Sequence, residues 1–420
     1  MPAVQNIRTL ALLGHAGAGK TTLIENLLAL SGAILQPGSV EKGTTVCDYD
    51  PLENEHQHSA KLSVACLDRS ELRVQLLDTP GFPDFAGQAM AALDAVETVM
   101  TVINPQNGIE ISASRAMLWA QTRKLCRVLV VNRIDAERLD LAQAVSDLQA
   151  AFGRECLPVN LPAGGAQRVV DCFFNPGGEA TDFSSVEEAH RAIVEQIVEV
   201  DEALTERYLN GEEIEPEALH DAFERSLCEG HIVPILFASA RSGAGLAELL
   251  DFIVRLAPNP CEGNPPLFEK WPHGNPDAAE EIKPSHDAAA HVLAHVFKLE
   301  VDPYLGKIAT LRVQQGTLTP DSQLYVGDAR KPFRVAHLFS VQGKQLNPIQ
   351  SAGPGEICAI TKIEELTFDA VLHDAPEDAA IHFRPLPLPY AVYGLAVRVK
   401  RRGEEQKLAE VLHRLEVEDP

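Results

Sequence analysis

The stretch GHAGAGKTT, residues 14–22, follows the apolar run IRTLALLG at 7–14 and leads into TLIENLLALSG, whose apolar residues recur at helical spacing. A strand, a glycine-rich loop and a helix in this order fit the phosphate-binding pattern G-x-x-x-x-G-K-[ST]. The glycines let backbone N–H groups approach phosphate oxygens, Lys20 neutralises β- and γ-phosphate charge, and the Thr21 hydroxyl is placed to bind Mg²⁺. The alternative is a glycine-rich turn that caps a helix and binds no ligand. The predicted phosphate contacts are Gly14, His15, Ala16, Gly17, Ala18, Gly19, Lys20, Thr21 and Thr22.

Strands and helices alternate along the first half of the chain. Runs rich in Val and Leu predict strands at 72–81, 99–105 and 126–135, and GQAMAALDAVETV, after the first of them, has helical spacing. Strands that are apolar on both faces and alternate with helices predict an α/β fold, a parallel sheet flanked by helices. Ligands of such sheets bind at the carboxyl ends of the strands, so the polar residues there form the candidate site.

The segment DTPGFPDF at 78–85 follows the second predicted strand. Asp78 can hold Mg²⁺ through a water molecule, and the Gly81 N–H can contact the γ-phosphate of a nucleotide. An isolated Asp-Pro-Gly turn would need no such role, but this one follows a phosphate loop on the same chain. The predicted catalytic group is Lys20, Asp78, Gly81 and Phe82.

Two further strand ends predict a pocket for a base. NRID at 132–135 supplies Asp135, whose carboxylate can accept both N1–H and N2–H of guanine, whereas adenine offers no such donor pair. ASAR at 238–241 follows the apolar run PILF and aims the Ala240 N–H at guanine O6. The predicted base contacts are Asn132, Arg133, Asp135, Ser239 and Ala240. The motifs together predict a domain that binds GTP in preference to ATP.

Composition divides the chain into regions. The GTP-binding domain is predicted at 1–258, with an acidic, helix-rich insertion at about 140–230 whose charges lie on solvated helix faces. A stretch rich in Pro, Gly and Asn predicts a linker at 259–290, and alternating residues with regular turn signals predict an all-β barrel at 291–375. Residues 385–420 predict one strand and one helix with nothing to pack against, the start of an α+β domain that looks cut short.

The bulk composition excludes several classes of protein. Of the 420 residues 45% are hydrophobic, but no apolar run is long enough to span a bilayer and no signal peptide is evident. Eight scattered cysteines without a CxxC pair predict reduced thiols in the cytoplasm. The formal net charge of −24 argues against DNA and against nonspecific nucleic-acid binding. The basic run RVKRR at 398–402 is interpreted as a solvated strand end, with a local RNA contact as the alternative.

The order of GHAGAGKTT, DTPG, NRID and ASAR resembles the elongation factor G family of translational GTPases, and the likeness extends over essentially the whole chain. FKLEVDPYLGKIATLRVQQGTLTPDSQLYV resembles the second-domain barrel of that family, and EEQKLAEVLHRLEVEDP resembles the opening of its third domain. The resemblance implies GTP or GDP with Mg²⁺ as cofactors, the ribosome as partner, a monomer and the cytoplasm. It also implies GTP hydrolysis in translocation or in ribosome disassembly.

The residues around the γ-phosphate depart from the family pattern. The family reads DTPGH, and its histidine positions the attacking water, whereas Phe82 here has neither a lone pair nor a donor. Ser59 falls where a family threonine binds Mg²⁺ and keeps a hydroxyl, so the predicted metal ligands are Thr21, Ser59 and Asp78. Intrinsic hydrolysis is therefore expected to be weak.

Other departures lie close by. His56 and His58 are candidate substitutes for the missing histidine, although solvated loop histidines are the favoured interpretation. Gly17 replaces an Asp of the family's monovalent-cation site, which puts potassium-assisted hydrolysis in doubt. Arg133 replaces the usual Lys of NKxD, a mild change because its stem can still lie along the guanine ring.

These changes spare the base and the β-phosphate, so nucleotide binding is expected to survive better than hydrolysis. A ribosome-linked GTPase is the favoured hypothesis. One alternative is a slow or nonhydrolysing module that binds the ribosome when GTP is bound. A ribosomal protection protein of the tetracycline-resistance type is less favoured, and a P-loop ATPase is the least favoured.

Overall fold

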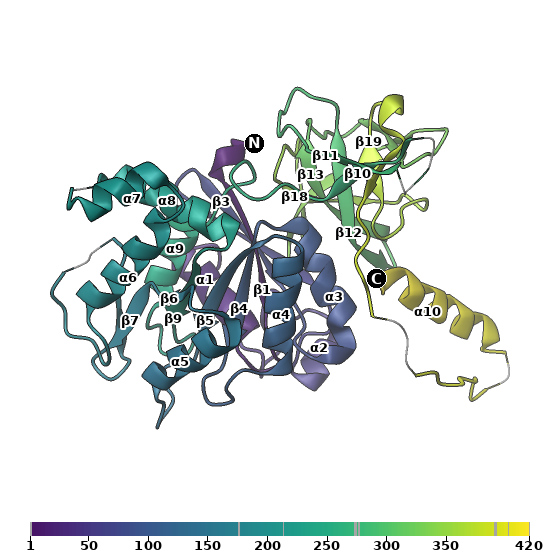
Figure 1. Ribbon diagram of the computed structural model, residues 1–420. Helices are drawn as coiled ribbons and strands as arrows, with labels where there is room; N and C mark the ends of the chain where they lie inside the picture. Colours follow the sequence, from purple (N-terminus) through teal and green to yellow (C-terminus); the bar gives the residue numbers. More distant parts are fainter. Residues whose placement is uncertain are drawn as a thin grey trace.

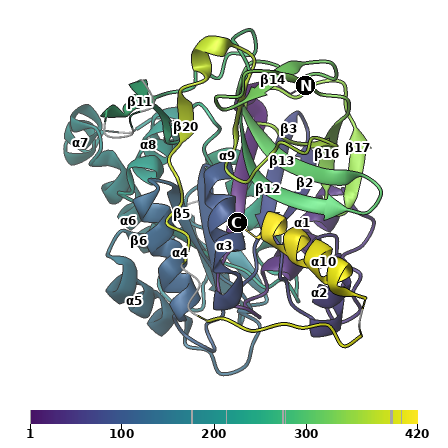
Figure 2. The ribbon, with the colours of Figure 1, turned by 90° about the vertical axis from the view of Figure 1, so that its right-hand side faces the viewer.

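The structure is a computed structural model that describes residues 2–174, 177–212, 214–272, 275, 278–389, 393–401 and 403–419. An α/β domain lies beside an antiparallel β domain, and a last helix, α10, lies near the junction of the two (Figure 1). Figure 2 shows the same helix in front of strand β12 of the β domain. Within the described residues, no helix is long and apolar enough to cross a membrane.

A seven-stranded sheet forms the centre of the α/β domain, in the order β2-β3-β1-β4-β5-β9-β6. Its strands are β1 (Ile7–Leu13), β2 (Ser63–Arg69), β3 (Leu72–Asp78), β4 (Thr98–Ile103), β5 (Cys126–Val131), β6 (Cys156–Pro158) and β9 (Val233–Phe237). Neighbours pair in parallel, except that β2 runs antiparallel to β3. Strands β1, β4, β5 and β9 are buried throughout because helices cover both faces of the sheet (Figure 1). The predicted α/β fold class is confirmed.

The helices that flank this sheet each follow the end of a strand. They are α1 (Lys20–Ser31), α3 (Ala86–Ala91), α4 (Ile111–Thr122), α5 (Leu141–Phe152) and α9 (Leu246–Leu256), and a short helix, α2 (Pro51–His56), lies in the segment between α1 and β2. The helix predicted in GQAMAALDAVETV is shorter than expected. A 3-10 turn at Ala92–Ala95 ends it, and Thr98 already belongs to β4, where a β-branched residue packs well.

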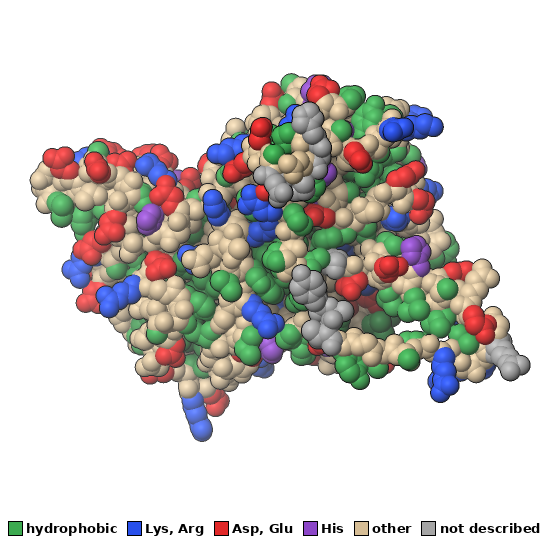
Figure 3. All heavy atoms as spheres, turned by 45° about the vertical axis from the view of Figure 1, so that its right-hand side comes forward, with side chains coloured by type: hydrophobic (Ala, Val, Ile, Leu, Met, Phe, Trp, Pro, Cys, Tyr) green, Lys and Arg blue, Asp and Glu red, His purple; other side chains and the backbone are tan. Residues whose placement is uncertain are grey.

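The insertion within this domain contains α6 (Val186–Val198), α7 (Glu202–Leu209), α8 (Pro216–Glu229) and a hairpin of β7 (Asn160–Ala163) and β8 (Arg168–Asp171). It begins later than the predicted residue 140, because β6 joins the main sheet beside β9. Acidic side chains gather on the outer surface of this lobe (Figure 3). Ile193, Ile197 and Phe223 are fully buried on the opposite side of these helices, so the charge run is a solvated face.

The β domain is an eight-stranded antiparallel sheet that curls around its own core, in the order β15-β14-β19-β12-β13-β18-β16-β17. Its strands are β12 (Leu293–Asp302), β13 (Gly306–Gln315), β14 (Gln323–Val326), β15 (Phe333–Arg334), β16 (Leu338–Gln342), β17 (Gln345–Pro348), β18 (Ile357–Thr361) and β19 (Val371–His373). The predicted linker is more ordered than expected: β10 (Phe268–Lys270) and β11 (Glu280–Ile282) pair with β20 (Ile381–Phe383) in a small sheet. Phe268 and Phe383 bury the apolar side of that sheet.

The two domains share a buried interface. Phe297, Ile357 and Ala359 of the β domain join one apolar cluster with Leu77 and Val99 of the α/β domain. The buried Arg312 guanidinium pairs there with the Glu97 carboxylate, which also accepts a hydrogen bond from Thr9.

The C-terminal prediction is partly wrong. Among the described residues of 385–401 there is no strand, and the predicted strand includes residues 390–392, which lie outside the described set. The predicted helix does form, as α10 (Glu405–Glu418), but it has a packing partner: it lies on β12, and Val417 packs against the core of the β domain. Arg398 and Arg401 of the basic run are exposed, and Arg402 lies outside the described residues.

Candidate functional site

The backbone of the glycine-rich loop holds the side chain of Lys20 by hydrogen bonds. Lys20, the first residue of α1, is 5% exposed, and its Nζ donates to the carbonyls of Gly14 at 3.0 Å and His15 at 3.1 Å. Gly14 has φ +135, and a Cβ there would collide with the Val102 carbonyl of β4. The loop therefore needs glycine to fold back between β1 and β4, which leaves Lys20 at the opening of α1, where anions bind.

Oxygen atoms gather beside this lysine. The Thr21 hydroxyl donates to Asp78 Oδ2 at 2.6 Å and lies 3.2 Å from the Ser59 hydroxyl. Asp48 is 4% exposed, and among the described residues neither of its carboxylate oxygens has a hydrogen-bond partner. Asp78 Oδ1 is also buried without such a partner. The predicted ligands Thr21, Ser59 and Asp78 thus lie together, and Asp48 joins them.

Burial and the nearby charges shift the pKa values of Asp78, Asp48 and Lys20. Burial, followed by the charge of Asp48, raises the pKa of Asp78 to about 7. Burial also raises the pKa of Asp48 and lowers the pKa of Lys20, although the two carboxylates oppose the latter change. Two carboxylates and one ammonium leave an excess of negative charge, which a cation would neutralise.

The predicted base residues meet at the ends of β5 and β9. Asn132 is 1% exposed; its Nδ2 donates to the Ala18 carbonyl at 2.8 Å, which ties the base pocket to the phosphate loop. The Ser239 hydroxyl donates to Asp135 Oδ1 at 2.6 Å and holds that carboxylate in place. The Ala240 N–H differs from the prediction: it donates to Asn132 Oδ1 at 3.0 Å instead of lying free for guanine O6. Arg133 and Asp135 are exposed.

A cavity of about 190 Å³ lies beside the phosphate loop, and Arg133 is the one predicted base residue that lines it. Its lining residues are Ala16, Gly17, Gly19, Lys20, Thr21, Thr22, Val40, Glu41, Asp48, Gln57, His58, Ser59, Gly81 and Arg133. Phe82 does not line this cavity; it lines a smaller one beside Pro83 and Trp119 and is 36% exposed. Gly81 approaches the loop so closely that a Cβ there would collide with the Ala16 amide nitrogen.

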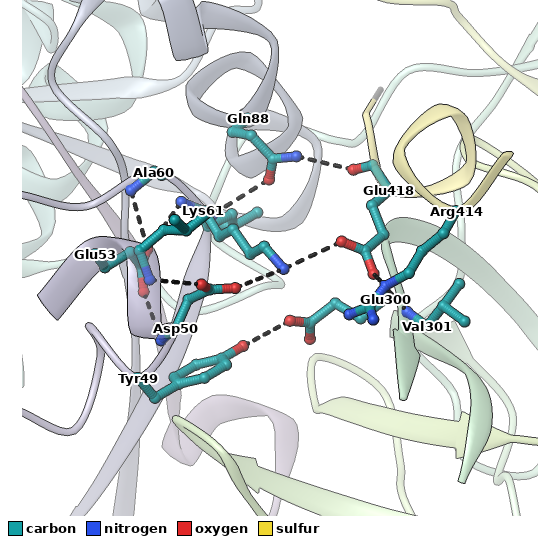
Figure 4. Close-up of polar contacts among 12 residues, drawn as sticks. Tyr49, Asp50, Glu53, Ala60, Lys61, Gln88, Glu300, Val301, Arg414 and Glu418 are labelled. Carbon is teal, nitrogen blue, oxygen red and sulfur yellow. Dashed lines mark hydrogen bonds and ion pairs between the residues drawn. The ribbon is translucent and has the colours of Figure 1, made fainter. Parts of the chain in front are cut away.

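The loop that carries His58 and Ser59 is held by a carboxylate (Figure 4). Glu53 of α2 is 2% exposed and accepts hydrogen bonds from the N–H groups of Asp50 at 3.0 Å, Ala60 at 2.9 Å and Lys61 at 3.0 Å. Because the N-terminal and C-terminal sides of α2 meet on one carboxylate, the residues between them have a fixed path.

Contacts from other elements fix the same loop from outside (Figure 4). Lys61 pairs with Glu418 of α10 at 3.1 Å, and Glu418 Oε1 accepts from the Val301 N–H of β12. Gln88 of α3 accepts from the Leu62 N–H and donates to the Glu418 carbonyl. Three parts of the chain therefore meet beside the phosphate cavity.

Sequence reasoning missed Asp48 and Glu53. Both are acidic residues in the polar segment between α1 and β2, which carries no nucleotide-binding motif. Asp48 becomes notable only because folding buries it without a partner, and Glu53 only because the chain returns to it after α2. The one local signal was for Glu53, three residues after Asp50, which forms a capping box.

The fold and the site define a class. A phosphate loop after β1, an aspartate at the end of β3 and Asn and Asp side chains after β5 at one edge of a parallel sheet are the machinery of a P-loop GTPase. The family profile described as the Elongation factor Tu GTP binding domain matches residues 5–259, and that of Elongation factor G domain 2 matches residues 291–373. The chain belongs to this family of translational GTPases and is elongation factor G-like.

Relatives support this membership. The chain is 34% identical to an "Elongation factor G-like protein" of Mycobacterium tuberculosis and 32% identical to one of Thermotoga maritima, over 99% and 100% of its length. A solved structure from Thermus thermophilus matches with a TM-score of 0.83 and 33% identity over 99% of the chain. In each case the chain spans 61% of the length of the relative.

Proposed function

We propose that this chain binds GTP with Mg²⁺ and hydrolyses it to GDP and phosphate in a step linked to the ribosome. The observation that carries the proposal is the cavity shared by Lys20, Thr21, Ser59 and Gly81, which gathers charge and hydrogen-bond donors suited to a triphosphate. Its lysine is already aligned on the loop carbonyls, so little reorganisation is needed when phosphate oxygens bind.

The oxygen donors near the cavity fit a magnesium ion. Mg²⁺ prefers hydroxyl, carboxylate, phosphate and water oxygens, and Thr21, Ser59, Asp78 and Asp48 offer the first two kinds. The unpartnered oxygens of Asp48 and Asp78 are the strongest support, because buried carboxylates without partners are unfavourable. When bound, the ion would neutralise phosphate charge.

The chain's own residues have separable roles in this proposal. Lys20 stabilises negative charge on the β- and γ-phosphates, and the Gly81 N–H contacts the γ-phosphate from the end of β3. Asp135, held by Ser239, selects guanine. Changing Asp135→Asn should shift preference from guanosine toward xanthosine nucleotides, measured by competition against a fluorescent GTP analogue. Unchanged guanosine preference would contradict this assignment of the base pocket.

The ribosome is proposed as partner, and the cytoplasm as the compartment, on the strength of the family. Relatives carry the description "Elongation factor G-like", and the match to elongation factor G domain 2 covers the β domain. Translocation and ribosome disassembly are the steps proposed.

The test is release of phosphate from GTP with and without bacterial ribosomes. Stimulation by ribosomes is expected. A second function, slow GTP-gated binding to the ribosome, is favoured by one observation: Phe82 lies outside the phosphate cavity and has no polar atom to orient water. Tight GTP binding with no turnover in either condition would refute the hydrolysis proposal and support this second function.

A further inference from the structure

The structure distinguishes His56, the last residue of α2, from His58, which lies in the loop after that helix. His58 is half-buried and lines the phosphate cavity together with Ser59 and Gly81, whereas His56 is exposed and does not line it. The interpretation of both as solvated loop histidines therefore holds for His56 but not for His58. His58 therefore supplies a polar side chain at the phosphate cavity, whereas Phe82 supplies no polar atom there.

The ring of His58 packs against the residue that replaces the family histidine. His58 and Phe82 make an edge-to-face contact with ring centroids 4.7 Å apart, and the centroids of the Phe85 and His58 rings are 6.1 Å apart. His56 stacks on His58 with centroids 5.8 Å apart. Aromatic neighbours on these sides hold the plane of the imidazole, so Phe82 acts as a support for His58.

Hydrogen bonding defines which nitrogen of His58 can accept a hydrogen bond. Its Nδ1 lies 3.2 Å from the carbonyl oxygen of Ser59, and a carbonyl oxygen can only accept. In the neutral imidazole the proton is therefore on Nδ1, and Nε2 keeps its lone pair. Among the described residues Nε2 has no hydrogen-bond partner, so it can accept a hydrogen bond from a water molecule at the cavity.

Hydrogen bonds to Glu53 fix the backbone on both sides of His58. Gln57 ends α2 in the left-handed conformation with φ 56, and the His58 N–H donates to the Glu53 carbonyl at 3.3 Å. The Glu53 carboxylate then takes the N–H groups of Ala60 and Lys61 just beyond (Figure 4). A side chain held on both sides in this way suits a role that depends on orientation.

We infer that His58 positions the water that attacks the γ-phosphate, a role that belongs to the residue after DTPG in the family pattern. The inference rests on the proposed hydrolysis. In this step the water oxygen bonds to the γ-phosphorus while the bond from that phosphorus to the β–γ bridging oxygen breaks. GDP leaves with the bridging oxygen, and the water protons end on the products. His58 Nε2 accepts a hydrogen bond from the water and aligns it, without a net gain of a proton.

The test compares variants for GTP affinity and for single-turnover hydrolysis. His58→Ala should bind GTP within about twofold of the parent and hydrolyse it about 10²-fold more slowly, the low end of what a positioned acid–base group contributes. His58→Gln should recover about tenfold over His58→Ala, because the side-chain carbonyl of Gln can accept the same hydrogen bond. Glu55→Ala changes an exposed residue of α2 that does not line the cavity; it is the matched control and should hydrolyse at the parental rate.

A second variant keeps the test independent of loop folding. In His58→Ala, adding Phe82→His should restore about tenfold of the lost rate, because the family pattern has its water-positioning histidine at this position. Parental hydrolysis by His58→Ala would overturn the inference alone, and loss of GTP binding would assign His58 a structural role and also overturn it. A parent that binds GTP but shows no turnover would instead refute the proposed hydrolysis, and the inference with it.

Discussion

Replacing Glu53 by Gln tests how the loop around His58 and Ser59 is held. The Glu53 carboxylate accepts three backbone N–H groups, with Oε1 shared by Ala60 and Lys61 and Oε2 taken by Asp50. Gln has the same shape but only one accepting oxygen. One backbone N–H must therefore face an NH₂ group, and the other two lose the negative charge of their acceptor.

The size of the effect follows from these three bonds. A hydrogen bond to a charged group contributes about 1.5–3 kcal/mol, and one to a neutral group about 0.5–1.5 kcal/mol. Losing one charged bond and weakening two should destabilise the closed loop by about 4 kcal/mol. Since about 1.4 kcal/mol is a factor of ten, local opening should become about 10²–10³-fold more frequent.

Hydrogen exchange measures this opening directly. The Ala60 and Lys61 amides of Glu53→Gln should exchange faster by about that factor, whereas amides of β1 and β5 keep parental rates. GTP hydrolysis should fall more than GTP affinity, because the phosphate loop does not depend on Glu53. Glu55→Gln changes an exposed carboxylate on the same helix and should leave both unchanged. If the Ala60 and Lys61 amides of a folded Glu53→Gln variant exchange at the parental rate, the Glu53 carboxylate does not hold this loop closed.

Three other perturbations have defined outcomes. Because burial raises the pKa of Asp78 to about 7, the ionised carboxylate destabilises the metal-free fold, and its stabilising protonated form is lost as pH rises through 7. The metal-free fold should therefore be more stable at pH 6 than at pH 8, with on the order of 1 kcal/mol of the difference coming from Asp78, and thermal unfolding of Asp78→Asn should show the difference reduced by that share. Glu97→Gln should destabilise the fold by about 3–5 kcal/mol in chemical denaturation, because it leaves the buried Arg312 without its charged partner. Glu418→Gln breaks the pair with Lys61 and should make α10 exchange amide protons about tenfold faster; an unchanged rate would contradict the docked position of α10.

The nucleotide motifs were predictable from the sequence because they are local. GHAGAGKTT and NRID each lie at the end of an apolar strand, and the topology of a parallel sheet brings such ends to one edge. The contact between Asn132 and Ala18, far apart along the chain, follows from that rule. The α/β class and the β domain followed from periodicity for the same reason.

What the sequence did not predict depends on contacts between distant segments. The strand expected at the start of the last segment is not formed within the described residues, because a strand needs a pairing partner that periodicity alone does not supply. Conversely, α10 has a partner that its amphipathic pattern could not identify. Asp48 and His58 lie in a polar loop whose path is fixed by Glu53, so their approach to the phosphate cavity is a property of the fold.

The most direct measurement of the central claim is nucleotide binding by calorimetry, with GTP and ATP compared in the presence and absence of Mg²⁺. We expect GTP to bind at least about 10²-fold more tightly than ATP, and removal of Mg²⁺ to weaken GTP binding. Equal affinity for ATP and GTP, or a GTP affinity that is the same with and without Mg²⁺, would contradict the assignment of this site to a GTPase.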